Sequence, residues 1–164
     1  MNKKGFTLVE LLATLVILGI VMGIVLISTT GGFDKAKNST EDVFVKTLED
    51  ALDIYLDSDA RNLSFNTMCS STINKTHKTG VKVYKSTSNV TFNDVINSSF
   101  KPITMGDMHN PANKGKDNYN CSTDGTLNIY RDEDYIYYYK IEKSTFGCLN
   151  KAGTITNLPS GFNC

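Results

Sequence analysis

The pattern of apolar and polar positions divides the chain into three stretches. An uncharged, strongly apolar run extends from Leu11 to Ile27. From Phe33 to Leu56 the apolar residues recur at steps of three or four, which favours an amphipathic helix. Asp57-Ser58-Asp59 then ends this pattern. A continuous helix over residues 6–56 would be about 75 Å long, and the rest of the chain is expected to cover its apolar stripe.

Beyond residue 59 the pattern predicts a small antiparallel sheet. Alternating residues, turn residues and a capping box of the form Thr-x-x-Asp at Thr91 and Asp94 mark the elements. The expected elements are strands Val81–Tyr84, Thr126–Tyr130 and Tyr135–Ile141, a turn at Arg131–Asp134, a short helix Phe92–Ser98, a long loop Lys101–Asn120, and a second hairpin of Phe146–Asn150 with Thr154–Thr156. The predicted fold class is therefore α+β, a long N-terminal helix with a small β-rich head.

Composition narrows the function classes. The 164 residues carry 17 basic and 17 acidic side chains, which excludes a chain-wide polycation and disfavours nucleic acid as a partner. One long apolar segment excludes a multi-span membrane protein. The sequence has only two His and no phosphate-binding loop, nor an interpretable Ser/His/Asp or Cys/His spacing. We therefore predict no enzyme, no catalytic residues and no cofactor.

The first residues form a compact motif. Lys3-Lys4-Gly5-Phe6-Thr7-Leu8-Val9-Glu10-Leu11-Leu12 combines a basic leader, a Gly-Phe step and a lone acid at the head of the apolar run. This motif closely resembles the processing site of type IV prepilins and type II secretion pseudopilins. The resemblance implies cleavage by prepilin peptidase between Gly5 and Phe6, and N-methylation of Phe6. It also implies a structural subunit made as a single-pass membrane precursor and then assembled into an extracellular filament at the cell surface.

Physical chemistry gives Glu10 a role within that resemblance. A carboxylate among packed apolar helices needs a cation, and the new α-amino group of Phe6 on a neighbouring subunit is the nearest one. Their pairing would set the axial register of assembly. Gly19 and Gly23 have the small-xxx-small spacing that permits close helix packing. Gly31 and Gly32 are expected to interrupt the helix as a hinge, because each costs about 1 kcal/mol relative to Ala.

The four cysteines, at positions 69, 121, 148 and 164, all follow the apolar segment. An even number on the exported side predicts two disulfides with three possible connectivities. The resemblance to pilins, many of which have a disulfide-bounded C-terminal region, favours Cys148–Cys164 and leaves Cys69–Cys121. Cys121–Cys148 is the rival pairing, because the Thr126–Ile141 hairpin would bring its ends together.

Charge is unevenly distributed along the head. Seven acids lie between Glu41 and Asp59, while the stretch Ala60–Asn93 has no acid and several bases. Pairing between the two stretches and two solvated faces are both open. A DNA contact by the basic stretch is the less favoured hypothesis, with these candidates: Lys75, His77, Lys78, Lys82 and Lys85.

Metal binding is not predicted. The acids Asp132, Glu133 and Asp134 form a turn that is expected to be solvated rather than to hold calcium. His77 and His109 lack the paired spacing of a Cys/His metal site.

The resulting organisation has four parts. They are a leader (1–5), a transmembrane and filament-core helix (6–30), an amphipathic helix (31–58) and a globular head (59–164). The expected partners are other copies of the chain, prepilin peptidase, the pilus or secretion machinery, and membrane lipid before assembly. The alternatives are a minor pilin or pseudopilin of a secretion or DNA-uptake apparatus, and a signal-anchored extracellular binding protein or enzyme.

Overall fold

The computed structural model describes the backbone of residues 8–164, and the side chains of residues 8–22 and 34–164. The chain divides into two compact units, Met1–Ser39 and Thr40–Cys164. One 51-residue helix, α1 (Leu8–Ser58), runs through both. In the part of the chain that the structure describes, no helix is long and apolar enough to cross a membrane.

The helix is not interrupted at Gly31-Gly32, contrary to the prediction from the sequence. The backbone of α1 is helical through both glycines. The conformational cost of a glycine is small beside the hydrogen bonds of a helix that continues on both sides, since propagation adds one bond per residue once a helix has formed. A hinge role during assembly stays a prediction.

Helix α1 ends where the sequence predicts. The side-chain hydroxyl of Ser58 donates to the carbonyl oxygens of Ile54 and Tyr55, at 2.9 and 3.3 Å. The last turn contains no basic residue, although a helix C-terminus favours cations. Asp59 instead accepts hydrogen bonds from the backbone N–H and hydroxyl of Ser99, at 3.2 and 2.8 Å. The acidic end of α1 is thereby tied to the head.

The head after α1 contains six strands, one short helix and five 3₁₀ turns. The strands are β1 (Thr67–Lys75), β2 (Lys78–Lys85), β3 (Val90–Thr91), β4 (Thr126–Asp132), β5 (Tyr137–Glu142) and β6 (Thr154–Thr156). The helices are α2 (Phe92–Ile96) and the 3₁₀ turns η1 (Ala60–Asn62), η2 (Met105–Asp107), η3 (Pro111–Asn113), η4 (Asp117–Tyr119) and η5 (Lys143–Phe146).

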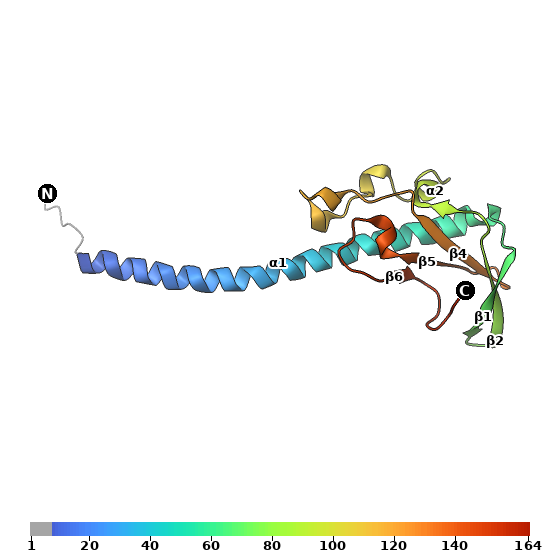
Figure 1. Ribbon diagram of the computed structural model, residues 1–164, viewed down its shortest axis with the longest axis horizontal. Helices are drawn as coiled ribbons and strands as arrows, with labels where there is room; N and C mark the ends of the chain where they lie inside the picture. Colours follow the sequence, from blue (N-terminus) through green and yellow to red (C-terminus); the bar gives the residue numbers. More distant parts are fainter. Residues whose placement is uncertain (1–7) are drawn as a thin grey trace. The chain divides into compact units, whose positions relative to one another are not determined.

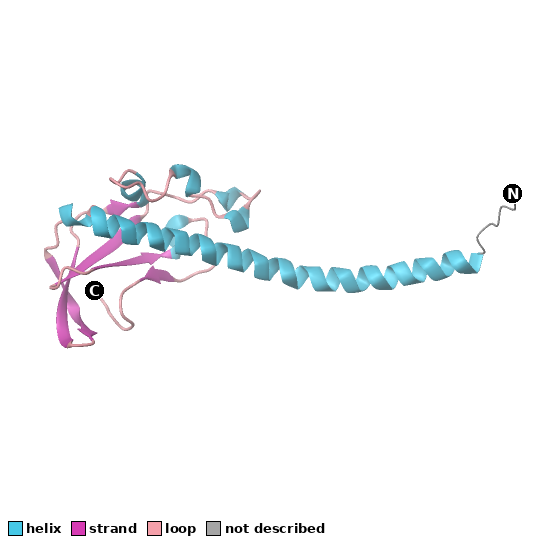
Figure 2. Cartoon of the chain, turned by 180° about the vertical axis from the view of Figure 1, so that it is seen from behind, coloured by secondary structure: helices cyan, strands magenta, loops and turns pink. Residues whose placement is uncertain are grey.

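The strands form one antiparallel sheet in the order β1-β2-β4-β5-β6, and β3 pairs with the start of β4. Because β2 pairs only with the end of β4, the β1–β2 hairpin extends from one corner of the sheet. Strands β4 and β5 lie along the later part of α1 (Figures 1 and 2). Together these elements confirm the predicted α+β fold.

The main core lies between α1 and this sheet. Every third or fourth residue of α1 from Phe44 is buried, and these side chains meet those of the central strands. The contributing residues include Phe44, Leu48, Leu52, Tyr55, Leu127, Ile129, Tyr139 and Ile141. A smaller cluster of Cys69, Ile73, Val81, Val83 and Tyr130 is packed against Leu158 and Phe162 near the C-terminus. The apolar stripe of α1 is thus covered by the sheet of the head, as the sequence predicts.

Several sequence predictions for the head are confirmed. Strand β2 contains Val81–Tyr84, and β4 and β5 occupy the two predicted strong strands. Helix α2 begins with the capping box, in which the carboxylate of Asp94 accepts from the backbone N–H and hydroxyl of Thr91. The turn between β4 and β5 is displaced, since Arg131 and Asp132 are still in β4.

Two further predictions for the head are wrong or incomplete. The segment Phe146–Asn150 forms no hairpin with β6, because β6 pairs with β5 through Glu142 and Thr154. Strand β1 was missed because only Cys69 and Ile73 of its nine residues are buried. The long loop 101–120 is ordered by three 3₁₀ turns and by the fully buried Asn110 and Asn113.

Candidate functional site

The residues predicted to act in processing and assembly precede α1 or lie in its N-terminal part. Gly5 and Phe6 are outside the described residues. Glu10 is in the first turn of α1 and is exposed. Gly19 has an open surface, because a Cβ added there would meet nothing within 4 Å. Gly23 continues the same helix, but its surroundings are outside the description.

The first turns of α1 are apolar around the whole circumference. Consecutive residues turn by 100°, so Leu15, Val16, Ile17 and Leu18 point in four directions. The large apolar side chains from Leu8 to Met22 are between 51% and 80% exposed. A helix that is apolar on every side is normally buried in protein or lipid. This segment therefore carries a large apolar surface.

Family comparison identifies this segment. A model of the prokaryotic N-terminal methylation motif matches residues 1–26. The chain carries the prepilin signature of type IV pilins and pseudopilins. Comparison with curated proteins and with solved structures found no match. The signature of a pilin-type precursor points to a structural protein that prepilin peptidase processes and pilus machinery assembles.

A buried carboxylate attaches the C-terminal part of the head to α1. Glu41 lies on α1, is only 2% exposed, and accepts hydrogen bonds from three residues of two loops. The backbone N–H groups of Asn150 and Lys151 donate to it at 3.0–3.1 Å, and the side-chain amides of Asn110 and Asn150 also donate. Burial would raise the pKa of Glu41, but these hydrogen bonds together lower it below its ordinary value. Sequence reasoning missed this role because Glu41 looks like one of several helix acids.

The disulfide pairing that we favoured is wrong. The structure pairs Cys69 with Cys164 and Cys121 with Cys148, with Cα–Cα distances of 4.8 and 4.9 Å. The rival pairing Cys121–Cys148 is confirmed, since the β4–β5 hairpin brings its two ends together and Ser122 donates to the carbonyl of Phe146.

The path of the C-terminal segment explains the other bridge. After β6 the chain packs Leu158 and Phe162 against the small cluster that includes Cys69. Cys164 is therefore held at β1, far along the sheet order from Cys148. Cys148 and Cys164 do not pair, because the segment after β6 carries the chain to β1.

The acids of the β4–β5 turn are paired with lysines of the β1–β2 hairpin. Asp132 is fully buried, and its carboxylate contacts the ammonium of Lys75 at 2.6 Å and the hydroxyl of Tyr138 at 2.9 Å. Burial and this hydrogen bond raise the pKa of Tyr138 to about 12. Asp134 pairs with Lys75 and Lys78 at 2.8 and 2.9 Å. The turn that was expected to be solvated is thus an ion-pair network.

This network shows which acids pair with the bases of the unevenly charged head. Within the described residues, the basic stretch pairs with the β4–β5 turn and not with the acids of α1. The α1 acid Asp42 pairs instead with Lys151, at 2.8 Å. Three of the lysines considered for DNA contact, Lys75, Lys78 and Lys82, therefore have acidic neighbours, which weakens that hypothesis.

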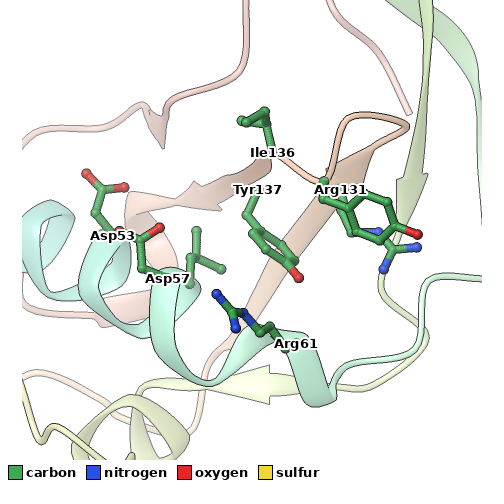
Figure 3. Close-up of a pocket in the computed structure, with 8 residues that line it drawn as sticks. Asp53, Asp57, Arg61, Arg131, Ile136 and Tyr137 are labelled. Atoms are coloured by element: carbon green, nitrogen blue, oxygen red, sulfur yellow. The ribbon is translucent and has the colours of Figure 1, made fainter.

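The head also contains a pocket of about 760 Å³ that is lined by both charged and apolar side chains. Its wall is formed by the end of α1, by Arg61 shortly after that helix, and by the β4–β5 hairpin around its turn (Figure 3). The lining residues are Asp53, Leu56, Asp57, Arg61, Arg131, Tyr135, Ile136 and Tyr137. None of these residues was singled out for ligand binding from the sequence, because they come from segments about 80 residues apart that only the fold joins.

Metal ligands are not gathered in the described head. No group of three His, Cys, Asp or Glu side chains there is arranged to hold a metal ion. His109 lies against the ring of Tyr119, with 4.8 Å between ring centroids.

Proposed function

We propose that this chain is a structural subunit of a type IV pilus-like filament. The observation that carries the proposal is the combination of the methylation motif over residues 1–26 with an apolar surface from Leu8 to Met22 that faces outward on every side. Such a surface is stable in lipid or among other apolar helices. A processed subunit uses both environments, first as a precursor and then in the filament.

Before assembly, the proposed precursor crosses the membrane once. A helix from Phe6 to about Ser28 is about 35 Å long, which suffices to span the apolar layer of a bilayer with some tilt. Lys3 and Lys4 stay on the cytoplasmic side by the positive-inside tendency. The head is then on the exported side, where its two disulfides are stable.

Processing and assembly are coupled through the new N-terminus. Cleavage after Gly5 creates the amine of Phe6, which is then methylated and remains cationic. In the filament this amine pairs with Glu10 of a neighbouring subunit. Buried polar pairs of this kind fix register rather than add much stability. Gly19 and Gly23 allow the helices to approach closely.

The decisive experiment identifies the mature N-terminus and the assembled state together. Mass spectrometry of sheared surface material should find a chain that begins with methylated Phe6, and electron microscopy should find filaments in that material. Gly5→Leu should leave the precursor uncut in the membrane, whereas Gly19→Ala, which adds one methyl in open space, should still be cut. A mature chain with an intact Met1, or with an end near Gly31, would favour a signal-anchored extracellular protein instead.

Abundance separates the two pilin-type roles. The signature is common to major pilins, minor pilins and pseudopilins, so the motif alone does not choose among them. A major subunit should dominate the sheared filament. A trace amount, with filaments made of another protein, would assign the chain to a minor pilin or to the pseudopilin of a secretion or DNA-uptake apparatus.

A further inference from the structure

The head pocket separates unpaired charges of opposite sign. Asp53 and Asp57 stand on α1 at one side, and Arg131 stands on β4 at the other, with Arg61 and Tyr137 between them (Figure 3). Within the described residues, neither arginine forms an ion pair with a carboxylate, and neither aspartate forms one with a basic side chain, although the charge of Lys46 acts on Asp53. The pocket is formally neutral, with two acidic and two basic side chains among apolar and aromatic ones.

Arg131 is held in place without being neutralised. Its guanidinium lies between the rings of Phe65 and Tyr135, 4.8 Å from each centroid. Its Nε is buried and has no hydrogen-bond partner. The nearest acids in the sequence, Asp132 and Asp134, are occupied by Lys75 and Lys78. The positive charge of the guanidinium therefore has no carboxylate partner among the described residues, which favours an anionic ligand group at this end of the pocket.

Tyr135 is positioned by an unusual backbone conformation. Its φ of 62° is in the left-handed region, which is uncommon for an aromatic residue. Tyr135 is 68% exposed at the pocket rim, and among the described residues its ring contacts Arg131. Strain of this kind is concentrated at functional positions. The exposed ring offers a face on which a ligand can stack.

The acidic end is suited to the opposite charge. Burial, together with repulsion from Asp50 and Asp57, raises the pKa of Asp53, although Lys46 lowers it. A cation between Asp53 and Asp57 would relieve that repulsion. An anion alone would face both aspartates, and a cation alone would face both arginines. A molecule that carries both charges avoids both repulsions, because each of its charged groups can lie beside side chains of the opposite charge.

We propose that this pocket binds a small zwitterionic ligand, whose carboxylate or phosphate contacts Arg131 and Arg61 and whose ammonium group contacts Asp53 and Asp57. The volume of about 760 Å³ suits a molecule the size of a short peptide or a phosphorylated headgroup. A peptide and a headgroup of this kind both present one anionic and one cationic group to the pocket. This site belongs to the head alone and does not depend on filament assembly.

The test uses the full chain purified in detergent and isothermal titration calorimetry. The zwitterionic probes are triglycine, for a peptide, and glycerophosphocholine, for a headgroup. N-acetyltriglycine and triglycine amide carry only one of the two charges and serve as matched controls. One zwitterionic probe should bind with saturation, and should bind at least about tenfold more tightly than the singly charged probes, as expected when one charge-assisted contact is lost. The probe that binds identifies the source.

Variants connect the binding to the pocket. Arg131→Gln and Asp57→Asn should each weaken binding by about tenfold or more. Asp57 is exposed on α1, so its variant tests the site without disturbing the core. Asp117→Asn removes an exposed acid that does not line the pocket, and should leave binding within about twofold. No saturable binding of either zwitterion, equal binding of the singly charged probes, or full binding by Asp57→Asn would overturn the proposal.

Discussion

The carboxylate of Glu41 accepts hydrogen bonds from both the backbone and the side-chain amide of Asn150, a residue 109 positions further along the chain. This contact joins the helix to the loop before β6. Because Asn110 donates to the same carboxylate, two loops and the helix meet at one buried acid. The head is thus attached to α1 by polar contacts at one end of the shared apolar core.

Replacing Glu41 with Gln should destabilise the head. The amide cannot accept from all of the N–H groups that now face the carboxylate, and leaving one buried donor unsatisfied costs about 1–3 kcal/mol. Denaturant unfolding of the full chain in detergent measures this change in the free energy of unfolding. Asp42→Asn removes the neighbouring acid, whose pair with Lys151 is exposed, and should cost less than about 1 kcal/mol. Equal effects of the two substitutions would contradict the role of Glu41.

The same site predicts a pH dependence. The pKa of Glu41 in the folded chain is below its ordinary value of 4.5. The unfolded chain therefore takes up the proton first as the pH falls. The contribution of Glu41 to stability is complete above the ordinary pKa and is lost as the pH falls through the lowered one. Stability curves between neutral and acidic pH should be steeper for the native chain than for Glu41→Gln.

The disulfide pairing predicts a specific peptide map. Digestion without reduction should release one pair of peptides joined through Cys69 and Cys164, and another joined through Cys121 and Cys148. In the chain-entropy model, bridges spanning 95 and 27 residues contribute about 4–5 and about 3–4 kcal/mol, respectively. Replacing both Cys69 and Cys164 should therefore lower the free energy of unfolding at least as much as replacing both Cys121 and Cys148. A peptide that joins Cys148 to Cys164 would refute this assignment.

Replacing Lys75 with Met should leave the buried carboxylate of Asp132 without the ammonium group that contacts it. A buried charged group that loses a hydrogen-bonding partner costs about 1–3 kcal/mol, measured as a lower free energy of unfolding. Lys82→Met is the matched control, because Lys82 approaches Glu133 only at 4.0 Å and is exposed. That control should stay within about 0.5 kcal/mol of the native chain. Equal stability of the two variants would mean that the ion pair between Lys75 and Asp132 does not stabilise the head.

Replacing Glu10 with Ala should separate processing from assembly. Cleavage and membrane insertion should continue, because they depend on the leader and the apolar run, while the yield of sheared filaments should fall strongly. Glu49→Ala removes a partly buried acid elsewhere on α1 and should leave the yield close to normal. Normal filament yield from Glu10→Ala would exclude the register role.

Local patterns predicted much of the fold because they act over a few residues. The steps of three and four from Phe33 to Leu56 predicted the amphipathic helix, and Asp57-Ser58-Asp59 predicted its end. The capping box at Thr91 predicted the start of α2. Strand β1 lacked such a signal, because only Cys69 and Ile73 point into the core from a polar segment.

The sequence by itself determined the prepilin signature, the long helix and the strong strands, since each depends on neighbours along the chain. Only the tertiary structure decided which cysteines pair, which acids meet which lysines, and that Glu41 is buried. It also decided that Arg131 and Asp57, from distant segments, face one pocket. These features depend on where β6 and the C-terminal segment cross the sheet, and that path is set by the packing of many side chains at once.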